Sequence, residues 1–344
     1  MPDVFRLGII GMGMISGQSH LPAALASVNI KVTALVDTCV ERASQLAQAF
    51  GIKPHITDSL SKILPEVDGV IIATPNNSHC SIAVECLNSG VHVLIEKPMA
   101  VCVEQCQEIL DASKKSGAVA TVGYSTRFKD EVIQMTHLLH SGFFGTIKRF
   151  AYEFGTRGGW DPVSGYILDR KAGGGGVVTV AGSHFLDRML YWFGYPRSIS
   201  YADDSLGGPE ANAEATLTFD SNGSAFQGFL RFSKTIALNS GFVMETDRGV
   251  VVMHGSQPPG IWFRPKSLSE FELLVANRTM TPGQGQTVYQ RQLENFVGAC
   301  QGTCQLEVSG QQGLESIRLI EAMYSQRTYL DYDSCQPPLG VAGS

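Results

Sequence analysis

A glycine-rich turn near the N-terminus is the first segment whose residue types and spacing suggest a defined chemistry. The run Gly8-Ile-Ile-Gly11-Met-Gly13-Met-Ile-Ser16 directly follows a short apolar segment. Gly11 allows the chain to turn, Gly13 allows the backbone to approach a pyrophosphate, and a helix starting near Met14 directs its N-terminal amides at negative charge. Ser16 takes the third glycine position of the dinucleotide-binding fingerprint and is small enough for close packing of helix on strand. The predicted dinucleotide-binding residues of this turn are Gly11, Met12, Gly13, Met14 and Ile15.

A carboxylate at the end of the second apolar run supports this interpretation. Asp37 lies about twenty residues beyond the glycine turn, where a carboxylate accepts hydrogen bonds from the adenosine ribose hydroxyls. A 2′-phosphate would meet a like charge there, so the sequence favours NAD(H) over NADP(H). Arg42 follows within about one helical turn and can accept a phosphate if the loop bends. The alternative for the whole pattern is an ordinary strand–helix turn followed by a surface Asp.

Short apolar runs alternate with amphipathic segments over residues 4–122, and these elements must position the groups above. The runs are rich in Val and Ile, as expected for strands buried on both faces. The predicted strands are Phe5–Ile10, Ile30–Val36, Val70–Ala73, His92–Ile95 and Ala118–Val122. Helices are predicted over Glu41–Phe50 and Glu104–Ser116. Such alternation builds a parallel sheet with right-handed crossovers, so residues 1–123 are predicted to form a dinucleotide-binding Rossmann domain of the α/β class.

The pattern changes after Val122. Strands then dominate, and short turns such as Asp220–Gly223 between them indicate an antiparallel sheet. The predicted helices are Lys129–Ser141, His184–Phe193, Tyr289–Cys300 and Gln311–Arg327. The predicted strands are Ile147–Phe154, Ala211–Phe219, Ser224–Phe232, Phe242–Thr246 and Gly249–His254. Residues 124–330 are therefore predicted to form an α+β domain with a mainly antiparallel sheet, and residues 331–344 a tail.

Composition and charge exclude several classes of protein. A chain of 344 residues is too long for one ordinary hydrophobic core and indicates about two domains. A net charge of −6, with both signs spread along the chain, leaves no basic stripe for nucleic acid. No apolar run reaches the ~18 residues of a membrane span, and no signal-peptide pattern precedes the glycines, so a cytoplasmic protein without membrane contact is expected. The eight cysteines lack a C-x-x-C pair and nearby His partners, which favours reduced thiols over a metal site.

Three further motifs carry a family resemblance. The segment Ala73–His79 (Ala-Thr-Pro-Asn-Asn-Ser-His) follows one predicted strand and Glu96-Lys97-Pro98 follows the next. The segment Gly174–Asp187 then begins with three glycines and contains Gly-Ser-His at 182–184. Together with the glycine turn, this set resembles the glucose–fructose oxidoreductase, inositol dehydrogenase and rhizopine catabolism (Gfo/Idh/MocA) family. The resemblance extends through Gly313–Ser325 and so covers almost the whole chain.

The resemblance implies a Rossmann domain followed by a substrate-binding and oligomerisation domain with a large open sheet. It also implies that substrate binds between the two domains, over the nicotinamide, and that the protein is a homodimer or homotetramer. Pro98 is expected to follow a cis peptide bond, which would fix the direction of Lys97. The residues implied to line the cofactor are Thr74, Pro75, Asn76, His79, Glu96 and Lys97.

Lys97 and His184 are the candidate catalytic residues. Oxidation of an alcohol requires a hydride acceptor, a group that takes the hydroxyl proton, and a cation or donor that stabilises the developing alkoxide. Lys97 can polarise the substrate oxygen, and His184 can take the proton. The alternatives are a solvated lysine at a strand end and a histidine that only caps or packs a helix start.

One position departs from the family pattern. The pattern usually has an Asp four residues before the histidine, where this sequence has Val180. Valine can neither orient an imidazole nor raise its basicity. Either another group orients His184, with Asp161 and Asp169 nearby in the sequence, or Lys97 carries more of the proton transfer.

Three residues are candidate substrate contacts. Arg127 follows the last predicted strand of the first domain and can contact cofactor or substrate, or form a salt link between domains. Trp160 and Tyr166 lie in a glycine-rich segment, and aromatic rings stack on the C–H faces of sugars. The alternative for both is packing on the core.

These observations leave three functional hypotheses. The first is an NAD-dependent dehydrogenase or reductase acting on a sugar, cyclitol or nucleotide sugar. The second is an enzyme that oxidises its substrate transiently, eliminates or epimerises, and regenerates NAD. The third is a catalytically silent dinucleotide-binding regulator. Stoichiometric release of NADH separates the first from the second, and the presence of Lys97 and His184 argues against the third.

Overall fold

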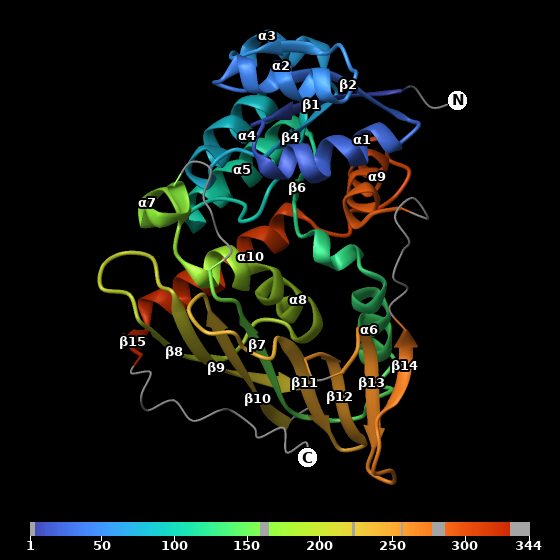
Figure 1. Cartoon of the computed structure of the whole chain (residues 1–344), viewed down its shortest axis with the longest axis vertical. Coiled ribbons are helices and arrows are strands. Elements are labelled where there is room, and N and C mark those ends of the chain that lie inside the picture. The colour runs from blue at the N-terminus through green and yellow to red at the C-terminus, as the bar shows by residue number, and fades with distance from the viewer. Residues whose placement is uncertain (1–3, 159–164, 222–223, 256, 277–285, 331–344) are drawn as a thin grey trace. The chain divides into compact units, whose positions relative to one another are not determined.

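The computed structural model describes residues 4–158, 165–221, 224–255, 257–276 and 286–330, and Figure 1 shows their elements. The chain forms two compact units, each assembled from separate stretches of sequence. The first unit contains Met1–Phe128, Lys171–Gly174 and Gly283–Arg318, and the second contains Lys129–Arg170, Gly175–Pro282 and Leu319–Ser344. None of the described helices is both long enough and apolar enough to cross a membrane.

A six-stranded parallel sheet with the strand order β3-β2-β1-β4-β5-β6 forms the centre of the first unit. The strands are β1 (Phe5–Ile10), β2 (Ile30–Val36), β3 (His55–Thr57), β4 (Gly69–Ile72), β5 (His92–Ile95) and β6 (Ala120–Val122). All but β3 were predicted, and β3 is too short to show a periodicity of its own. This doubly wound order confirms the predicted Rossmann fold.

Helices follow the strands of the first unit and supply its outer layers. They are η1 (Ser16–His20), α1 (Leu21–Ala26), α2 (Val40–Ala49), α3 (Leu60–Ile63), η2 (Leu64–Glu66), η3 (Asn76–Ser78), α4 (His79–Asn88), α5 (Val103–Ser116), η4 (Ser125–Phe128) and α9 (Val288–Cys300). The helix α10 (Gly310–Ser325) begins in the first unit and ends in the second. The predicted helices at 41–50 and 104–116 correspond to α2 and α5.

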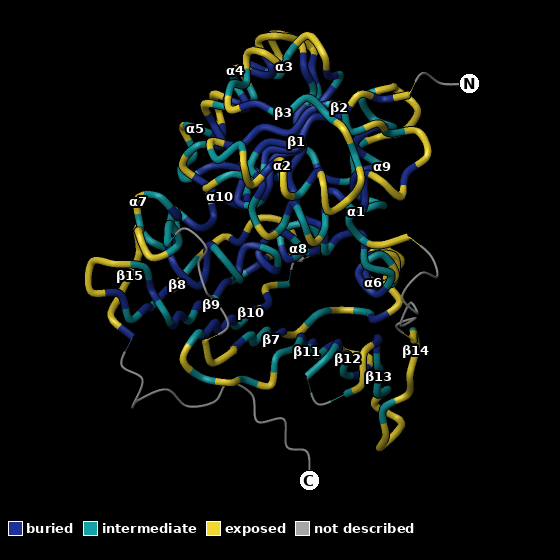
Figure 2. The backbone as a smooth tube through the Cα atoms, turned by 45° about the horizontal axis from the view of Figure 1, so that its top comes forward, coloured by how far each residue is buried: buried dark blue, intermediate teal, exposed yellow. Residues whose placement is uncertain are grey.

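The strands of this sheet are buried on both faces, as their continuous apolar sequences require. Figure 2 shows them as buried segments between helices whose outer surfaces are exposed. The core of the unit includes Leu7, Ile9 and Ile71, together with Phe296 from α9. Burying a side chain of this size contributes about 1.5–3 kcal/mol. The sheet is thus a rigid base for the turns that follow its strands.

The second unit contains a nine-stranded mixed sheet with the order β14-β13-β12-β11-β7-β10-β9-β8-β15. The strands are β7 (Ile147–Gly155), β8 (Ser198–Asp203), β9 (Asn212–Ser221), β10 (Ser224–Ser233), β11 (Gly241–Thr246), β12 (Gly249–His254), β13 (Gly260–Pro265), β14 (Glu272–Ala276) and β15 (Arg327–Tyr329). Neighbours pair antiparallel except β7 with β10 and β8 with β15. The predicted α+β class with a mainly antiparallel sheet is therefore confirmed.

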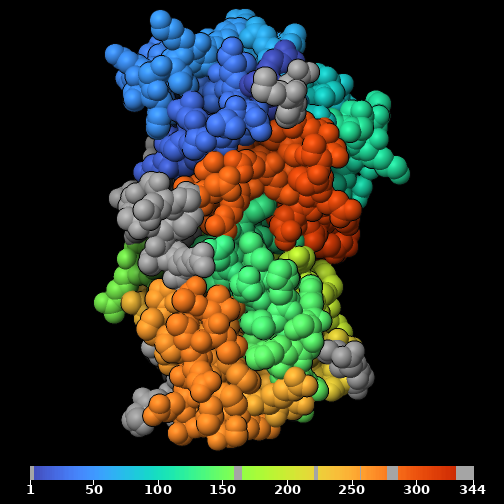
Figure 3. All heavy atoms as spheres, turned by 90° about the vertical axis from the view of Figure 1, so that its right-hand side faces the viewer, coloured from blue at the N-terminus to red at the C-terminus, as the bar shows by residue number. Residues whose placement is uncertain are grey.

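Helices cover one face of this sheet. The helical elements of the second unit between β6 and β8 are α6 (Asp130–His140), η5 (Tyr166–Leu168), η6 (Val178–Gly182) and α8 (Ser183–Phe193). The short helix α7 (Arg170–Gly173) belongs to the first unit from Lys171 onward. In the space-filling view, α6 lies beside β13 and β14 (Figure 3). From α8, the Phe185 ring stacks on Tyr152 of β7 with 3.6 Å between ring centroids.

A cluster of aromatic rings fixes this helix-covered face, and Phe150 is its centre. The Phe150 ring lies 4.9–6.4 Å, centroid to centroid, from five other phenylalanine rings. These partners are Phe185, Phe193, Phe219, Phe226 and Phe242. Offset and tilted arrangements of this kind are the favourable ones for aromatic pairs.

We therefore expect Phe150→Ala to lower the free energy of unfolding by about 3–5 kcal/mol, because it leaves a cavity among the rings. Phe229→Ala is the matched control, since Phe229 is only half-buried and lies on the opposite face of β10. Urea unfolding followed by tryptophan fluorescence, to which Trp192 beside Phe242 contributes, measures the difference. Equal losses in both variants would contradict the central role of Phe150.

Candidate functional site

The glycine turn follows β1 as predicted. Gly11 has a φ of +89°, and a Cβ at this position would lie 2.6 Å from the carbonyl oxygen of Ala73. Gly13 has open space where a Cβ would be, so the backbone there is accessible to a ligand. The helical segment starts at Met14, and Ser16 Oγ donates to the carbonyl oxygen of Gly11 at 2.5 Å. A left-handed turn with an open second glycine before a helix fits a dinucleotide pyrophosphate.

Asp37 is held at the end of β2 by the turn itself. Its side chain is buried, with Oδ2 accepting from the Met12 amide at 2.6 Å and Oδ1 accepting from the Cys39 amide at 2.8 Å. A carboxylate offers about four acceptor positions, so these amides leave room for hydroxyl donors. The half-exposed Arg42 guanidinium lies 3.4 Å from Oδ2. The structure thus joins the glycine turn and the predicted ribose-binding carboxylate.

The turn after β4 is tied to the turn after β5 through His79. The buried imidazole lies 2.9 Å from the carbonyl oxygens of both Thr74 and Pro98. Burial lowers the pKa of His79, and these hydrogen bonds oppose that effect. Asn76 is also buried and donates from Nδ2 to the carbonyl oxygen of Gly173 at 2.8 Å. His79 and Asn76 thus hold backbone segments in this structure.

Lys97 follows directly after β5 and Glu96. The peptide bond between Lys97 and Pro98 is cis, as expected. Burial lowers the pKa of the Lys97 ammonium group, and the negative charge of Glu96 opposes that effect. A lysine with a lowered pKa is suited to exchange a proton near neutral pH. It is not the solvated lysine that the alternative interpretation described.

Sequence reasoning missed His20 as a member of this site. His20 Nε2 lies 2.8 Å from Glu96 Oε1, and both side chains are buried. A histidine on a helix gives no signal in the sequence that it will meet a carboxylate seventy-six residues away. The contact depends on how η1 packs beside the end of β5.

Arg127 is buried within the first unit. Its Nη1 donates to the carbonyl oxygen of Glu307 at 3.2 Å. This bond links η4 to the segment that precedes α10. The contact is therefore with a backbone carbonyl of the same unit.

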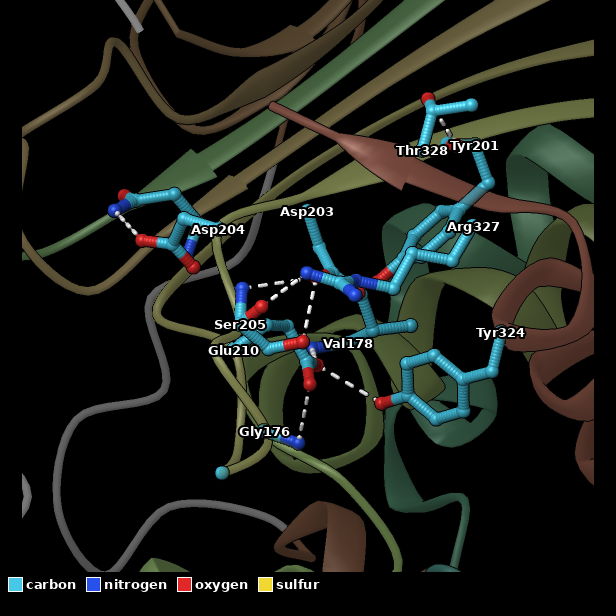
Figure 4. Close-up of polar contacts among 12 residues, drawn as sticks. Gly176, Val178, Tyr201, Asp203, Asp204, Ser205, Glu210, Tyr324, Arg327 and Thr328 are labelled. Carbon is cyan, nitrogen blue, oxygen red and sulfur yellow. Dashed lines mark hydrogen bonds and ion pairs between the residues drawn. The ribbon is translucent and has the colours of Figure 1, made fainter. Parts of the chain in front are cut away.

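His184 lies in the first turn of α8, in the second unit. The five residues before α8 form the π-helical turn η6, which includes Val180. The amides of Gly176 and Val178 donate to the two oxygens of the Glu210 carboxylate at 2.9 Å and 3.0 Å. Figure 4 shows Glu210 between these amides and the Tyr324 hydroxyl, which donates to it at 2.9 Å. Glu210 thus binds the start of the helical segment that carries His184.

The remaining predicted site residues lie in the second unit or outside the described residues. Tyr166 is half-exposed at the start of η5 in the second unit, while Trp160 and Asp161 lie outside the described residues. The candidates of the glycine turn, Asp37, the Ala73–His79 segment and Lys97 all belong to the first unit.

Two family models match consecutive parts of this chain. The family model described as "Oxidoreductase family, NAD-binding Rossmann fold" matches residues 5–124, and "Oxidoreductase family, C-terminal alpha/beta domain" matches residues 137–328. The rhizopine catabolism protein MocA of Rhizobium meliloti is 26% identical over 324 residues, which are 92% of this chain and 93% of that protein.

Solved structures share the fold over almost the whole chain. The WlbA dehydrogenase from Bordetella pertussis, in complex with NADH and UDP-GlcNAcA, has a TM-score of 0.79 at 21% identity, over 95% of this chain and 96% of its own. A variant of a 3-ketoreductase from Actinomadura kijaniata, in complex with TDP-benzene and NADP, has a TM-score of 0.77 at 19% identity, over 95% and 99%.

The environment of Glu210 generates a testable pH dependence. Burial raises the pKa of Glu210 above its ordinary value of 4.5. The folded protein therefore keeps a proton that the unfolded chain releases, and this group's contribution to stability falls as the pH rises from 4.5 through the raised value. Glu210→Gln cannot titrate, so the difference in unfolding free energy between wild type and this variant should decrease over that range.

Urea unfolding at a series of pH values measures this difference. Glu272→Gln, on the exposed edge strand β14, is the matched control and should show no such trend. A difference for Glu210→Gln that stays constant with pH would contradict the buried, proton-binding environment.

Proposed function

The chain belongs to the Gfo/Idh/MocA oxidoreductase family, and from that premise we propose that it transfers a hydride between a nicotinamide dinucleotide and a hydroxyl or carbonyl carbon of a sugar, cyclitol or nucleotide sugar. The observation that carries this proposal is the position of Lys97. It follows β5 at the same edge of the parallel sheet as the glycine turn after β1, where ligands of this fold bind.

Two residues would perform the chemistry at the substrate oxygen. The cofactor, when bound, supplies the hydride acceptor or donor. The Lys97 ammonium group stabilises negative charge that develops on the oxygen during oxidation, and a desolvated ammonium does so more strongly than a hydrated one. His184 takes the hydroxyl proton or, in a weaker role, donates a hydrogen bond that positions the oxygen.

We extend the proposal to the arrangement of the whole chain. Residues 1–123 bind the dinucleotide, and residues 124–330 bind substrate and form a homodimer or homotetramer. Arg127 and two aromatic residues, Trp160 and Tyr166, are proposed substrate contacts. The relatives in complex with UDP-GlcNAcA and TDP-benzene support a sugar or nucleotide sugar as the substrate class.

NAD(H) is the proposed cofactor in preference to NADP(H), although relatives in complex with either are known. The support comes from the two amide bonds that fix the Asp37 carboxylate. A carboxylate anchored in this way cannot turn away from an incoming 2′-phosphate, so like charges would meet. Arg42 is close enough to neutralise part of that repulsion.

The cofactor preference predicts that Asp37→Ala reduces the ratio of NADP(H) to NAD(H) dissociation constants by about tenfold or more, which corresponds to about 1.4 kcal/mol. Titration of both reduced cofactors by fluorescence quenching measures the ratio. Asp111→Ala, which removes an exposed carboxylate from α5, is the control and should leave the ratio unchanged. Tighter NADPH than NADH binding in the wild type would refute the preference.

The roles of Lys97 and His184 predict different losses. After a screen of sugars and cyclitols with both cofactors, Lys97→Ala should lower turnover by about 10² or more with little change in cofactor affinity. His184→Asn should retain a substantial fraction of turnover, because Val180 offers no carboxylate to support a histidine base. Val180→Asp should then change the pH profile more than the rate.

Two results would change these assignments. Near-normal turnover of Lys97→Ala on the identified substrate would remove Lys97 from the chemistry and move the stabilisation of charge on the oxygen to another residue. His184→Asn as inactive as Lys97→Ala would make the histidine the base. Stoichiometric NADH release separates net oxidation from transient oxidation.

A further inference from the structure

His20 is a buried titratable residue in the first unit that the proposed chemistry does not use. Its side chain is only 3% exposed and lies at the end of η1, the helical turn that follows the glycine turn. Nε2 is 2.8 Å from Glu96 Oε1. Because an ionised carboxylate only accepts hydrogen bonds, the imidazole must be the donor, and it can donate from Nε2 in the neutral or the charged form.

Glu96 connects His20 to Lys97. While Oε1 accepts from His20, Oε2 accepts from the Lys97 backbone amide at 3.1 Å. Gly123 packs against the same side chain, because a Cβ there would lie 3.2 Å from the Cα, Cδ and Oε1 atoms of Glu96. The φ of Gly123 is not in the left-handed region, so the need for glycine at this position comes from space alone. The Glu96 side chain is thus held in one position.

Titratable groups from four elements act on this carboxylate. Besides His20 from η1 and Lys97 after β5, they are His79 from α4 and Tyr289 from α9. The Tyr289 ring stands edge-on to the His20 ring with 5.4 Å between centroids. Burial raises the pKa of Tyr289 and the charge of Glu96 raises it further, while hydrogen bonds with Ser125 and Ser19 lower it. Tyr289 therefore faces Glu96 as a neutral phenol that packs His20 in place.

His20 affects the pKa of Glu96, and Glu96 in turn affects the pKa of Lys97. Burial by itself raises the pKa of Glu96, but the hydrogen bond and charge of His20, together with Lys97, bring it below its ordinary value. The ionised Glu96 in turn raises the pKa of Lys97 against the effect of burial. Removing the His20 donor would therefore favour the neutral form of Glu96, and Lys97 would then lose its proton at lower pH.

We propose that His20 is a positioning residue for Lys97: through a single hydrogen bond it holds the Glu96 carboxylate ionised and in place, and it links the helix after the glycine turn to the catalytic lysine. The geometric link stands on the contacts above, whereas its catalytic meaning rests on the proposed function. A variant at His20 should change the protonation of Lys97 without removing any group that touches substrate.

The experiment measures the reactivity of the Lys97 amine directly, on the full chain without cofactor. Trace acetylation with acetic anhydride is carried out over a range of pH, and the Lys97 peptide is quantified by mass spectrometry, with the exposed Lys53 as internal reference. His20→Leu should lower the midpoint pH of Lys97 acetylation by about one pH unit. His20→Gln, whose amide can still donate to Glu96, should stay closer to the wild type.

Three further variants separate this role from a general packing effect. Glu96→Gln should lower the midpoint pH of Lys97 acetylation as His20→Leu does. The double variant of His20→Leu and Glu96→Gln should show no additional shift, because both changes act by removing the negative charge of Glu96 beside Lys97. His92→Leu is the matched control at the opposite end of β5, where Nδ1 accepts from the Val119 amide, and it should leave the midpoint unchanged. If His20→Leu does not fold, His20→Asn, which is too short to reach Glu96, takes its place.

The outcomes are distinguishable from those that test the function. An unchanged midpoint in the His20 variants, additive shifts in the double variant, or an equal shift in His92→Leu would overturn the proposal. A shifted midpoint together with near-normal turnover of Lys97→Ala would keep the link and reject the catalytic assignment. An unchanged midpoint with a severe loss in Lys97→Ala would keep the function and reject the link.

Discussion

The parallel hydrogen bonding of the first-unit sheet continues for one residue past the end of several strands. The amide of Gly11 donates to Val36, that of Ala73 to Ile10, and that of Glu96 to Ile72. Each motif with a chemical role starts at one of these last bonds. The register of the strands therefore places the side chains of these motifs at the same edge of the sheet. Burial of the Val- and Ile-rich strands stabilises that register, because a shift by one residue would turn their side chains to the other face. Asp37, whose amide bonds to Thr57, belongs to the same row.

Charge burial at this edge is difficult to explain by stability alone. Taking a carboxylate and a histidine out of water costs several kcal/mol per ion, and a buried pair often contributes no more than apolar side chains of the same size. The pair formed by His20 and Glu96 nevertheless lies in the interior, one residue from Lys97. Burial and neighbouring charges shift the pKa values of Glu96 and Lys97, and ionisable groups with shifted pKa values concentrate at functional sites. The interior position excludes solvent that would otherwise weaken the effect of one charge on the next.

The sequence allowed the prediction of everything that depends on local pattern. The strands of the Rossmann sheet are continuous apolar runs, and the glycine turn, Asp37 and the Glu-Lys-Pro motif each carry their own signal. The strands β3, β8, β13, β14 and β15 were not predicted. The strands β3 and β15 have three residues each, and β14 and β15 lie at the edges of the second sheet, so pairing rather than periodicity defines them. The contact of His20 with Glu96 and the return of residues 283–318 to the first unit depend on tertiary packing. No spacing rule in a single sequence contains that information.

The second unit positions its candidate catalytic residue, His184, differently from the way the first unit positions Lys97. Sheet register fixes Lys97, whereas His184 lies on a helical segment whose start is bound by the Glu210 carboxylate, with Tyr324 and Thr179 completing a hydrogen-bonded chain. In the family pattern the carboxylate stands on the helix itself, at the position of Val180. The Glu210 carboxylate acts on the backbone amides of Gly176 and Val178, so it sets the direction of the helix without choosing the tautomer of the imidazole. In the proposed function, a histidine supported in this manner positions the substrate oxygen and does not act as the base. This difference in support is the physical reason why we propose that the loss of Lys97 lowers turnover more than the loss of His184.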